Sequence, residues 1–254
     1  MILPRTPNQR LDGKRALVTG GTRGIGLGAA VALAEAGAHV TVVSRTSADV
    51  AATSGALQAA GRAAAGAVLD VTDVAAVQAF IGGVAPFDIL VNSAGGARHS
   101  GFFEITEADY QAVMDLNLKS ALFVSQAVAA RLIETQRPGS IIHISSQMGH
   151  VGGPRRAVYS ASKFAVEGLS KAMAIELGPH NIRVNTICPT FIETELTSKT
   201  LADPEFRTWV LAKIKLGRLG RIEDIMGPVV FLASDAAAMM TGSSLMVDGG
   251  WTSE

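Results

Sequence analysis

Residues 15–26 of the chain have the sequence RALVTGGTRGIG. The first five residues form a short apolar run typical of a buried strand, and a helical pattern rich in alanine follows the glycines as far as Gly37. A strand, a glycine-rich turn and a helix in this order present backbone N–H groups and a helix N-terminus to a phosphate. The turn needs glycine because a side chain would keep the backbone away from its ligand.

This stretch predicts a dinucleotide-binding turn, although any glycine cluster has a purely structural turn as its alternative. The spacing is Gly-x-x-x-Gly-x-Gly instead of the more familiar Gly-x-Gly-x-x-Gly. The residues expected to contact the dinucleotide here are Gly20, Thr22, Arg23, Gly24, Ile25 and Gly26.

Strand-like and helical patterns alternate along the rest of the chain. We expect strands at 15–19, 39–44, 65–69, 88–92, 140–145, 182–187 and 244–247. We expect helices at 24–36, 46–60, 73–82, 106–134, 157–178 and 221–234. This alternation predicts one doubly wound, Rossmann-like α/β domain over residues 1–254, with a seven-stranded parallel sheet flanked by helices.

Residues 188–220, which we call the cover segment, interrupt the alternation. They follow the sixth predicted strand and so leave the sheet near its carboxyl edge, where folds of this kind bind ligands. Because excursions of this length are often functional lids, we expect the cover segment to enclose the substrate.

The composition excludes several classes of protein. Lys+Arg and Asp+Glu are 22 each, so the chain has no electrostatic footprint for nucleic acid. The polar segment at residues 1–9 has no apolar core for a signal peptide, and no apolar run reaches the length of a membrane span. Cys188 is the single cysteine, so no intrachain disulfide is possible. These features predict a cytoplasmic protein.

Polar or turn-forming residues follow one predicted strand after another. In a parallel sheet these strand ends share one edge with the glycine turn, so together they predict a binding site. Taken singly, each has an ordinary alternative as a turn or a helix cap. They are Asp70-Val71 after the third strand, Asn92-Ser93-Ala94-Gly95 after the fourth, Ser145-Ser146 at the end of the fifth, and Pro189-Thr190-Phe191-Ile192-Glu193-Thr194 after the sixth.

Tyr159 and Lys163 lie four residues apart in a predicted helix, which places a phenol and an ammonium group on one face. A free tyrosine ionises near pH 10, and a neighbouring cation favours its phenolate. We therefore expect Lys163 to lower the pKa of Tyr159 toward the range useful for acid–base catalysis. A partly buried ring beside a solvated charge is the ordinary alternative.

Taken together, these motifs resemble those of the classical short-chain dehydrogenase/reductase family, over essentially the whole chain. The matching positions are Thr19-Gly20-x-x-x-Gly24-Ile25-Gly26, Asn92-Ser93-Ala94-Gly95, Asn117, Ser146, Tyr159-x-x-x-Lys163 and Asp248-Gly249-Gly250. Two positions depart from the family pattern: Thr190 replaces a usual glycine, and Ser93 replaces a commoner asparagine.

The resemblance implies an oxidoreductase that interconverts a carbonyl and a secondary alcohol by hydride transfer. It implies Tyr159 as general acid–base, Ser146 as a donor to the substrate oxygen, Lys163 as a ligand of the nicotinamide ribose, and Asn117 as the holder of a relay water. It also places Asp70 and Val71 at the adenine, Asn92, Ala94 and Gly95 beside the adenosine ribose, and Pro189, Ile192 and Thr194 at the nicotinamide.

The charged residues that follow the second predicted strand indicate whether the cofactor is NAD(H) or NADP(H). Enzymes of this kind that use NAD usually carry an acidic residue there, whereas this chain has Ser44-Arg45. Arg45 and Arg23 are suited to pair with the 2′-phosphate, so we expect NADP(H) in preference to NAD(H). A solvated charge is the alternative for Arg23.

The substrate and assembly are open at this point. Candidate substrates are 3-oxoacyl thioesters, sugars or polyols, and hydrophobic ketones, and relatives suggest a homotetramer or homodimer. An NAD-linked sugar or polyol dehydrogenase is the alternative enzyme, and a non-catalytic dinucleotide-sensing protein is the alternative from another class. We expect no metal, because the five histidines and one cysteine show no ligand spacing.

Four further side chains have no assigned role. His150 is a candidate for lining the substrate pocket, and Arg155 and Arg156 are either an exposed pair or a site for an anionic substrate. Trp209, in the cover segment, is either packing or part of the pocket wall.

Overall fold

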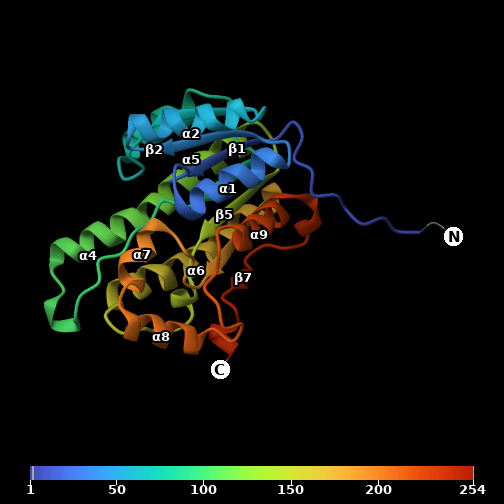
Figure 1. Ribbon diagram of the computed structural model, residues 1–254. Helices are drawn as coiled ribbons and strands as arrows, with labels where there is room; N and C mark the ends of the chain where they lie inside the picture. The colour runs from blue at the N-terminus through green and yellow to red at the C-terminus, as the bar shows by residue number, and fades with distance from the viewer. Residues whose placement is uncertain (2, 254) are drawn as a thin grey trace.

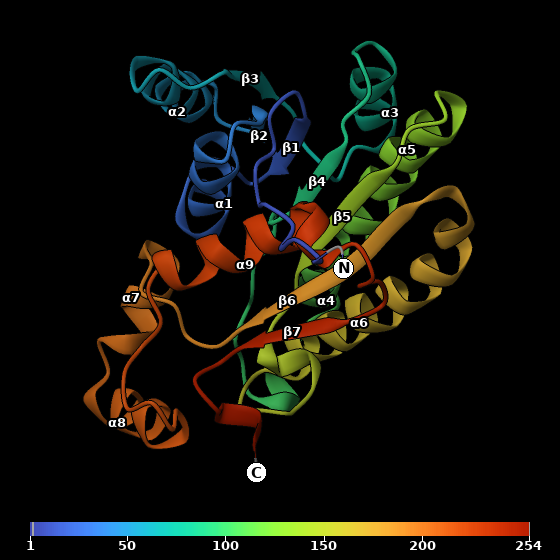
Figure 2. The same ribbon diagram turned by 90° about the vertical axis from the view of Figure 1, so that its right-hand side faces the viewer.

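Seven strands form one parallel sheet in the computed structural model, which describes residue 1 and residues 3–253. Ile2 and Glu254, which the predicted domain includes, lie outside the described residues. The strands are β1 (Arg15–Thr19), β2 (His39–Ser44), β3 (Ala64–Val68), β4 (Ile89–Asn92), β5 (Gly139–Ile144), β6 (Ile182–Pro189) and β7 (Ser244–Val247). Their order across the sheet is β3-β2-β1-β4-β5-β6-β7, which confirms the predicted doubly wound α/β fold (Figures 1 and 2).

The strand order reverses at β1, because β1 pairs with β2 on one side and with β4 on the other. At the carboxyl end of β1, Thr19 lies opposite Val43 of β2 and Asn92 of β4. Crossovers leave a reversal point in opposite directions, so the loops separate there and open a crevice for a ligand.

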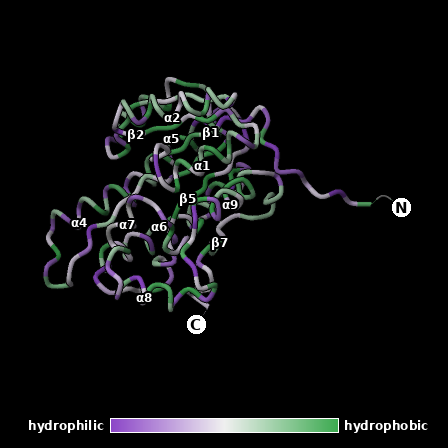
Figure 3. The backbone as a smooth tube through the Cα atoms, viewed as in Figure 1, coloured by the Kyte–Doolittle hydropathy of each residue, from purple (hydrophilic) through white to green (hydrophobic). Residues whose placement is uncertain are grey.

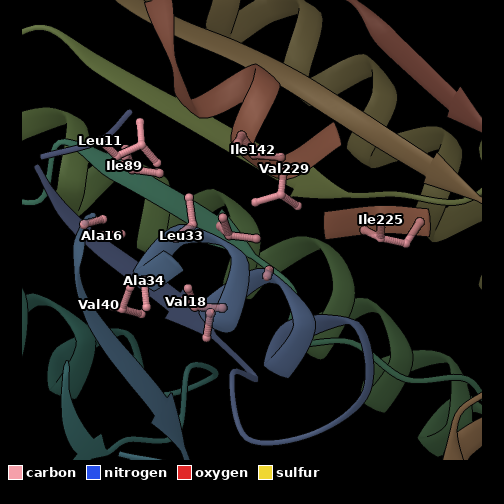
Figure 4. Packing of buried hydrophobic residues seen from close by; sticks show 14 of the residues in the cluster. Leu11, Ala16, Val18, Leu33, Ala34, Val40, Ile89, Ile142, Ile225 and Val229 are labelled. Carbon is pink, nitrogen blue, oxygen red and sulfur yellow. The ribbon is translucent and has the colours of Figure 1, made fainter. Parts of the chain in front are cut away.

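One face of the sheet is covered by α1 (Gly24–Glu35), α2 (Ser47–Ala59) and α9 (Glu223–Ala233) (Figure 2). Leu33 of α1 and Val229 of α9 belong to the same buried cluster as Ile142 of β5, and Val229 lies beside Ile142 (Figure 4). The two helices approach closely because α1 has a glycine at the contact: a Cβ on Gly28 would lie 2.2 Å from Ile222 Cγ2.

The opposite face is covered by α3 (Val74–Gly82), α5 (Ser120–Glu134) and α6 (Ala157–Leu177). Val77 of α3, Leu132 of α5 and Ala174 of α6 share one buried cluster with Leu17 and Ile141 of the sheet. The central strands are therefore apolar on both sides, as a sheet covered by helices on both faces requires.

The helix predicted at 106–134 is confirmed as one unbroken helical stretch over residues 107–134, but it is not α-helical throughout. It consists of α4 (Glu107–Met114), a π-helical turn η2 (Asp115–Lys119) and α5. A π turn inserts one extra residue into the helical repeat, and the pattern of apolar residues does not reveal it. The turn carries Asn117, which is 3% exposed although it is polar.

The cover segment contains two helices, α7 (Glu195–Leu201) and α8 (Pro204–Lys213), at the end of the molecule nearest the C-terminus (Figure 1). Its apolar side chains join a third buried cluster, separate from the two on the sheet faces, that includes Met148, Phe191, Val210 and Trp251. The predicted break in the strand–helix alternation is thus a packed subregion.

Hydrophobic residues collect along the strands, whereas much of the N-terminal segment that leads away from the body is hydrophilic (Figure 3). Among the described residues, none of the helices combines the length and hydropathy needed to cross a bilayer.

Candidate active site

The glycine turn between β1 and α1 packs directly on the loop after β4. A Cβ on Gly20 would lie 3.0 Å from Ala94 Cα, and one on Gly26 would lie 2.1 Å from the carbonyl oxygen of Gly20. Thr19 Oγ1 accepts hydrogen bonds from the backbone N–H groups of Ser93 and Ala94, each at 3.1 Å. Both positions therefore require glycine, and the backbone is left bare where a ligand would approach.

The N-terminus of α1 suits a phosphate. Arg23 is its N-cap residue and makes no side-chain capping bond, and the first turn contains no acidic residue. Uncapped N–H groups at a positive helix end form an anion site when glycine lets the ligand approach. Thr22 and Ile25 are half-buried at the same turn, and Gly24 has a φ of +52°. The turn thus fits the pyrophosphate of a dinucleotide.

The residues predicted for the adenosine end lie beside β2 and β3. The Asp70 carboxylate accepts hydrogen bonds from the N–H and hydroxyl of Thr72, which hold its pKa below the ordinary value, with a smaller contribution from the charge of Arg45. Val71 is buried, and Ser44 is half-buried. Arg23 and Arg45 are both exposed.

Asn92, which the family resemblance places beside the adenosine ribose, is the last residue of β4. Its side-chain amide points into the protein, where Nδ2 donates to Ser125 Oγ at 2.9 Å and lies 3.2 Å from His143 Nδ1. This leaves the main chain of Asn92, with that of Ala94 and Gly95, as the surface available to a cofactor. The sequence could not reveal this, because the partner Ser125 lies 33 residues away.

Ser146 lies just beyond the end of β5 and caps the short helix η3 (Gln147–Gly149). Its hydroxyl accepts from the backbone N–H of Met148 at 3.1 Å and donates to Gln147 Oε1 at 2.9 Å. Gln147, which sequence reasoning missed, is 2% exposed and fixes the direction of this hydroxyl. An amide following a strand-end serine gives no distinctive sequence signal.

Tyr159 is in the first turn of α6, beside Ser146. Although the ring is half-buried, the surroundings of its hydroxyl raise the pKa of Tyr159 above the ordinary value of 10.0 through burial. The hydrogen bond with Ser146 and the charge of Arg156 act in the opposite direction. The expectation that Lys163 lowers this pKa is therefore wrong for the structure as it stands: desolvation of the phenolate is the larger effect.

The position of Lys163 explains why its charge has little influence on the pKa of Tyr159. Nζ donates to the backbone carbonyl of Ile144 at 2.8 Å and lies 5.8 Å from the centroid of the Tyr159 ring. Burial lowers the pKa of Lys163 to about 8, even though Cys188 and Glu167 raise it. The ammonium is thus only partly charged in the mildly alkaline range, and it is anchored at the end of β5.

Asn117 connects the π turn to the loop after β4. Its Nδ2 donates to the carbonyl of Gly96 and its Oδ1 accepts from the N–H of Gly96, both at 2.9 Å. Nδ2 also donates to Ser162 Oγ at 3.0 Å, and Ser162 in turn donates to the carbonyl of Tyr159. A Cβ on Gly95 would lie within 4 Å of both Asn117 Oδ1 and Lys163 Nζ. The structure therefore brings Asn117 and Lys163 to the loop at residues 93–96 and links Asn117 to Tyr159 through Ser162, while Ser146 lies beside Tyr159.

The loop after β6 closes this edge. Thr194 approaches the glycine turn, since a Cβ on Gly24 would lie 3.5 Å from Thr194 Cγ2. Thr197 Oγ1 donates to the carbonyl of Ile192, and Ile192 forms an isolated bridge with Gly220. Pro189 ends β6, so Pro189, Ile192 and Thr194 follow one another from the sheet edge toward the dinucleotide turn.

His150 contacts a buried polar cluster. Its Nε2 lies 3.7 Å from a Glu167 oxygen and 3.4 Å from Cys188 Sγ, and the three groups lie within 4.8 Å of one another. Burial raises the pKa of the Cys188 thiol to about 12, so the thiol stays protonated and donates to Glu167. No sequence spacing indicated this group, because its members come from three separate elements.

Of the remaining candidates, Arg155 is exposed with a φ of +58°, and Arg156 is 8% exposed. Trp209 of α8 stacks on Phe206 and packs edge-on against Trp251. Phe191 stacks on the other side of this aromatic group.

The chain is similar to known proteins over nearly its whole length. A family model described as Enoyl-(Acyl carrier protein) reductase matches residues 20–252. D-erythrulose reductase from Gallus gallus is 42% identical over 248 residues, covering 96% of this chain and 98% of the relative. Gluconate 5-dehydrogenase from Gluconobacter oxydans is 40% identical over 249 residues, covering 95% and 96%.

The crystal structure of a gluconate 5-dehydrogenase from Burkholderia cenocepacia, in complex with NADP and tartrate, superimposes with a TM-score of 0.94. It is 38% identical to this chain, and the alignment covers 97% of this chain and 98% of that one. Likeness at this level extends over the whole fold, including the carboxyl edge of the sheet.

Proposed function

The chain belongs to the short-chain dehydrogenase/reductase family, and from that premise we propose that it is an NADP(H)-dependent enzyme that reduces the ketone of a small polyhydroxylated substrate. The interconversion of a carbonyl and an alcohol is common to its relatives, which include a D-erythrulose reductase and a gluconate 5-dehydrogenase. The chain is thus an oxidoreductase, and the finer points are its cofactor, residues and substrate.

The observation that carries the proposal is the pairing of Tyr159 with Ser146 at the carboxyl edge of the sheet. Their hydroxyls are hydrogen-bonded, and burial keeps Tyr159 protonated at neutral pH. A substrate oxygen that enters between them accepts two hydrogen bonds, one from each hydroxyl, as negative charge develops on it. Tyr159 Oη then gives up its proton to that oxygen, which completes the alcohol.

Ser146 must turn to make this contact, because its proton points to Gln147 Oε1 at 2.9 Å. The Oε1 atom of Gln147 accepts the hydrogen bond from the Ser146 hydroxyl until a substrate oxygen takes its place as the acceptor. Lys163 and Asn117 both lie at the loop of residues 93–96, and we propose that Lys163 returns a proton to the phenolate through a water held at Asn117. A bound nicotinamide cofactor supplies the hydride to the carbonyl carbon.

NADP(H) is proposed over NAD(H) on charge. Arg23 and Arg45 are exposed beside the glycine turn and the end of β2, and residues 44–46 contain no carboxylate to repel a 2′-phosphate. A phosphate there would also gain from the uncapped N-terminus of α1. One solved relative contains NADP, which supports the same choice.

We further propose a homodimer or homotetramer in the cytoplasm. Large apolar side chains are exposed on the helices expected to pack between subunits: Tyr110 of α4 is 47% exposed, Phe164 of α6 is 49% exposed, and Ile175 of α6 is 77% exposed. Apolar groups gathered on one side of a molecule often mark an interface. Sedimentation velocity of the wild type against Phe164→Glu tests this, with a shift to monomer expected.

A turnover screen tests the proposed function. Oxidation of NADPH and of NADH is followed at 340 nm with ketoses, keto sugar acids, 3-oxoacyl esters and simple ketones, and the reverse reaction with the matching alcohols. We expect the fastest turnover with a polyhydroxylated ketone and NADPH. Tight NADPH binding with no turnover of any compound would contradict the proposal and favour a dinucleotide-sensing protein.

A further inference from the structure

Arg156 is a buried cation without a counter-ion. Its side chain is 8% exposed, yet it forms no ion pair with any described residue. Burial lowers the pKa of Arg156, and the charge that opposes this shift is that of Tyr159 rather than of a carboxylate. An unpaired charge inside a protein is costly, so proteins rarely keep one unless it has a task.

The surroundings hold the guanidinium in one orientation. Arg156 Cζ lies 5.1 Å from the ring centroid of Phe191 and 5.6 Å from that of Phe206, so two aromatic rings of the cover segment pack against it. These rings belong to the stacked group that also contains Trp251. Aromatic faces attract a guanidinium but leave its N–H groups unsatisfied.

The third neighbour is His99, in the loop after β4. Burial, together with the charges of Arg156 and Arg155, lowers the pKa of His99 to about 4, although part of the ring reaches solvent. His99 is therefore neutral at pH 7, and its Nε2 accepts a hydrogen bond from Arg156 Nη1 at 2.7 Å. The imidazole satisfies one donor of the arginine without neutralising it.

The opposite edge of the guanidinium has no partner. Nε is buried and makes no hydrogen bond with any described residue. The hydrogen bond from the guanidinium to His99 is made by Nη1, on the other edge of the group, and not by Nη2. The Nε and Nη2 donors point side by side, in the fork geometry that matches the two oxygens of a carboxylate. A planar anion bound there would receive two parallel hydrogen bonds.

This free edge lies next to the reaction centre. Arg156 is the N-cap residue of α6, and Tyr159 follows in the first turn of that helix, near enough for the charge of Arg156 to act on the pKa of Tyr159. His99 also packs edge-on against the Tyr159 ring, with 6.2 Å between the ring centroids. A substrate whose carboxylate binds Arg156 could therefore place its ketone oxygen near the hydroxyl of Tyr159.

We propose that Arg156 binds a carboxylate of the substrate, so that the enzyme acts on a keto acid or its hydroxy acid, held between the free edge of Arg156 and the hydroxyl of Tyr159. This inference rests on the proposed reductase function and specifies its substrate class. His99 and the rings of Phe191 and Phe206 are positioning residues that set the direction of the guanidinium.

Matched pairs of substrates test the proposal. Each keto acid, from acetoacetate to 5-keto-D-gluconate, is compared with its neutral primary amide, and D-fructose 6-phosphate serves as a phosphate-bearing ketose. For the wild type we expect kcat/KM to be at least about tenfold higher for the best acid than for its amide, as loss of charge-assisted hydrogen bonds implies. Equal rates for every acid and amide, or a preference for the phosphate, would overturn the assignment.

Substitutions of Arg156 and its neighbour test whether Arg156 causes the preference for the acid over the amide. Arg156→Gln is expected to lower kcat/KM for the acid about ten- to a hundredfold and to leave the amide within about threefold. Arg156→Lys retains charge without the fork and should give an intermediate acid preference. The neighbouring Arg155→Gln, which removes an exposed arginine, should leave both substrates unchanged.

Folding and function are checked separately. NADPH affinity and turnover of the amide in Arg156→Gln report an intact fold and active site. An equal fall for acid and amide in that variant would show a structural role and overturn the inference, while the reductase assignment would stand. Absence of turnover by the wild type with every carbonyl compound would instead contradict the proposed function.

Discussion

Asn117 clamps Gly96 through both of its backbone polar groups: Nδ2 donates to the Gly96 carbonyl, and Oδ1 accepts from the Gly96 N–H, each at 2.9 Å. The π turn that carries Asn117 aims its side chain inward at this loop, which lies between the glycine turn and Tyr159. Because both hydrogen bonds come from one side chain, the amide of Asn117 holds the backbone of the loop in a single conformation.

Asn117→Ala should impair the enzyme through this loop. Two backbone groups lose their partners, at about 1–3 kcal/mol for each one that stays buried and unpaired. We expect kcat/KM to fall by at least about tenfold and the thermal midpoint to drop. Ser162→Ala is the control, because it removes the third partner of Asn117 and leaves the Gly96 clamp; an equal loss in both variants would contradict the account.

We expect the titration of Lys163 to set the pH above which the rate of carbonyl reduction falls. Its pKa is lowered to about 8 by burial, so Nζ loses its proton as the pH rises through that value. Burial raises the pKa of Tyr159 above 10.0, so the phenol stays protonated over the same range and does not set the limit. We expect kcat/KM for reduction to be flat below about pH 8 and to fall above it.

The pH profile has two controls. Lys163→Arg, whose guanidinium stays charged, should abolish the limb near pH 8 whatever its effect on the rate. Lys171→Met removes an exposed lysine of the same helix and should leave the limb in place. A limb that survives in Lys163→Arg would assign it to another group.

Gly26 and Gly55 form a matched pair of glycines. A Cβ at Gly26 would lie 2.1 Å from the Gly20 carbonyl oxygen, whereas one at the exposed Gly55 of α2 meets nothing within 4 Å. Gly26→Ala should therefore weaken NADPH binding at least about tenfold by displacing the turn. Gly55→Ala should raise stability by about 0.5–1 kcal/mol and leave cofactor affinity unchanged, as fluorescence titration and thermal melts would show.

Arg45 should select the cofactor. Replacing it with alanine removes a cation near the expected 2′-phosphate, and a charge-assisted hydrogen bond contributes about 1.5–3 kcal/mol. We expect KM for NADPH to rise about ten- to a hundredfold with KM for NADH little changed. The exposed Arg62, beyond the end of α2, provides a control in Arg62→Ala, and unimpaired use of NADPH by Arg45→Ala would support NAD as the cofactor.

The sheet and the site edge were predictable because they depend on local pattern. Seven apolar runs separated by helical patterns specify a parallel sheet, and strand-end residues such as Asp70 and Ser146 must then share an edge. Most element boundaries agree within one or two residues, and the β6 strand extends to Pro189 beyond its expected end at 187.

What escaped prediction depends on contacts between distant segments. The π turn at Asn117, the inward amide of Asn92 and the buried Arg156 each depend on partners that are 21 to 57 residues away in the sequence. The pKa of Tyr159 was misjudged for a related reason: spacing reveals a neighbouring cation, but the burial that outweighs it arises only when the cover segment and η3 pack around the site.

The central claim is that Tyr159 donates the proton to the substrate oxygen, and Tyr159→Phe tests it most directly. With the best ketone from the screen, kcat should fall about 10²- to 10⁴-fold while NADPH affinity changes little. Tyr110→Phe, at the only other tyrosine, exposed on α4, should match the wild type. A Tyr159→Phe enzyme that kept more than about a tenth of the wild-type kcat would contradict the account.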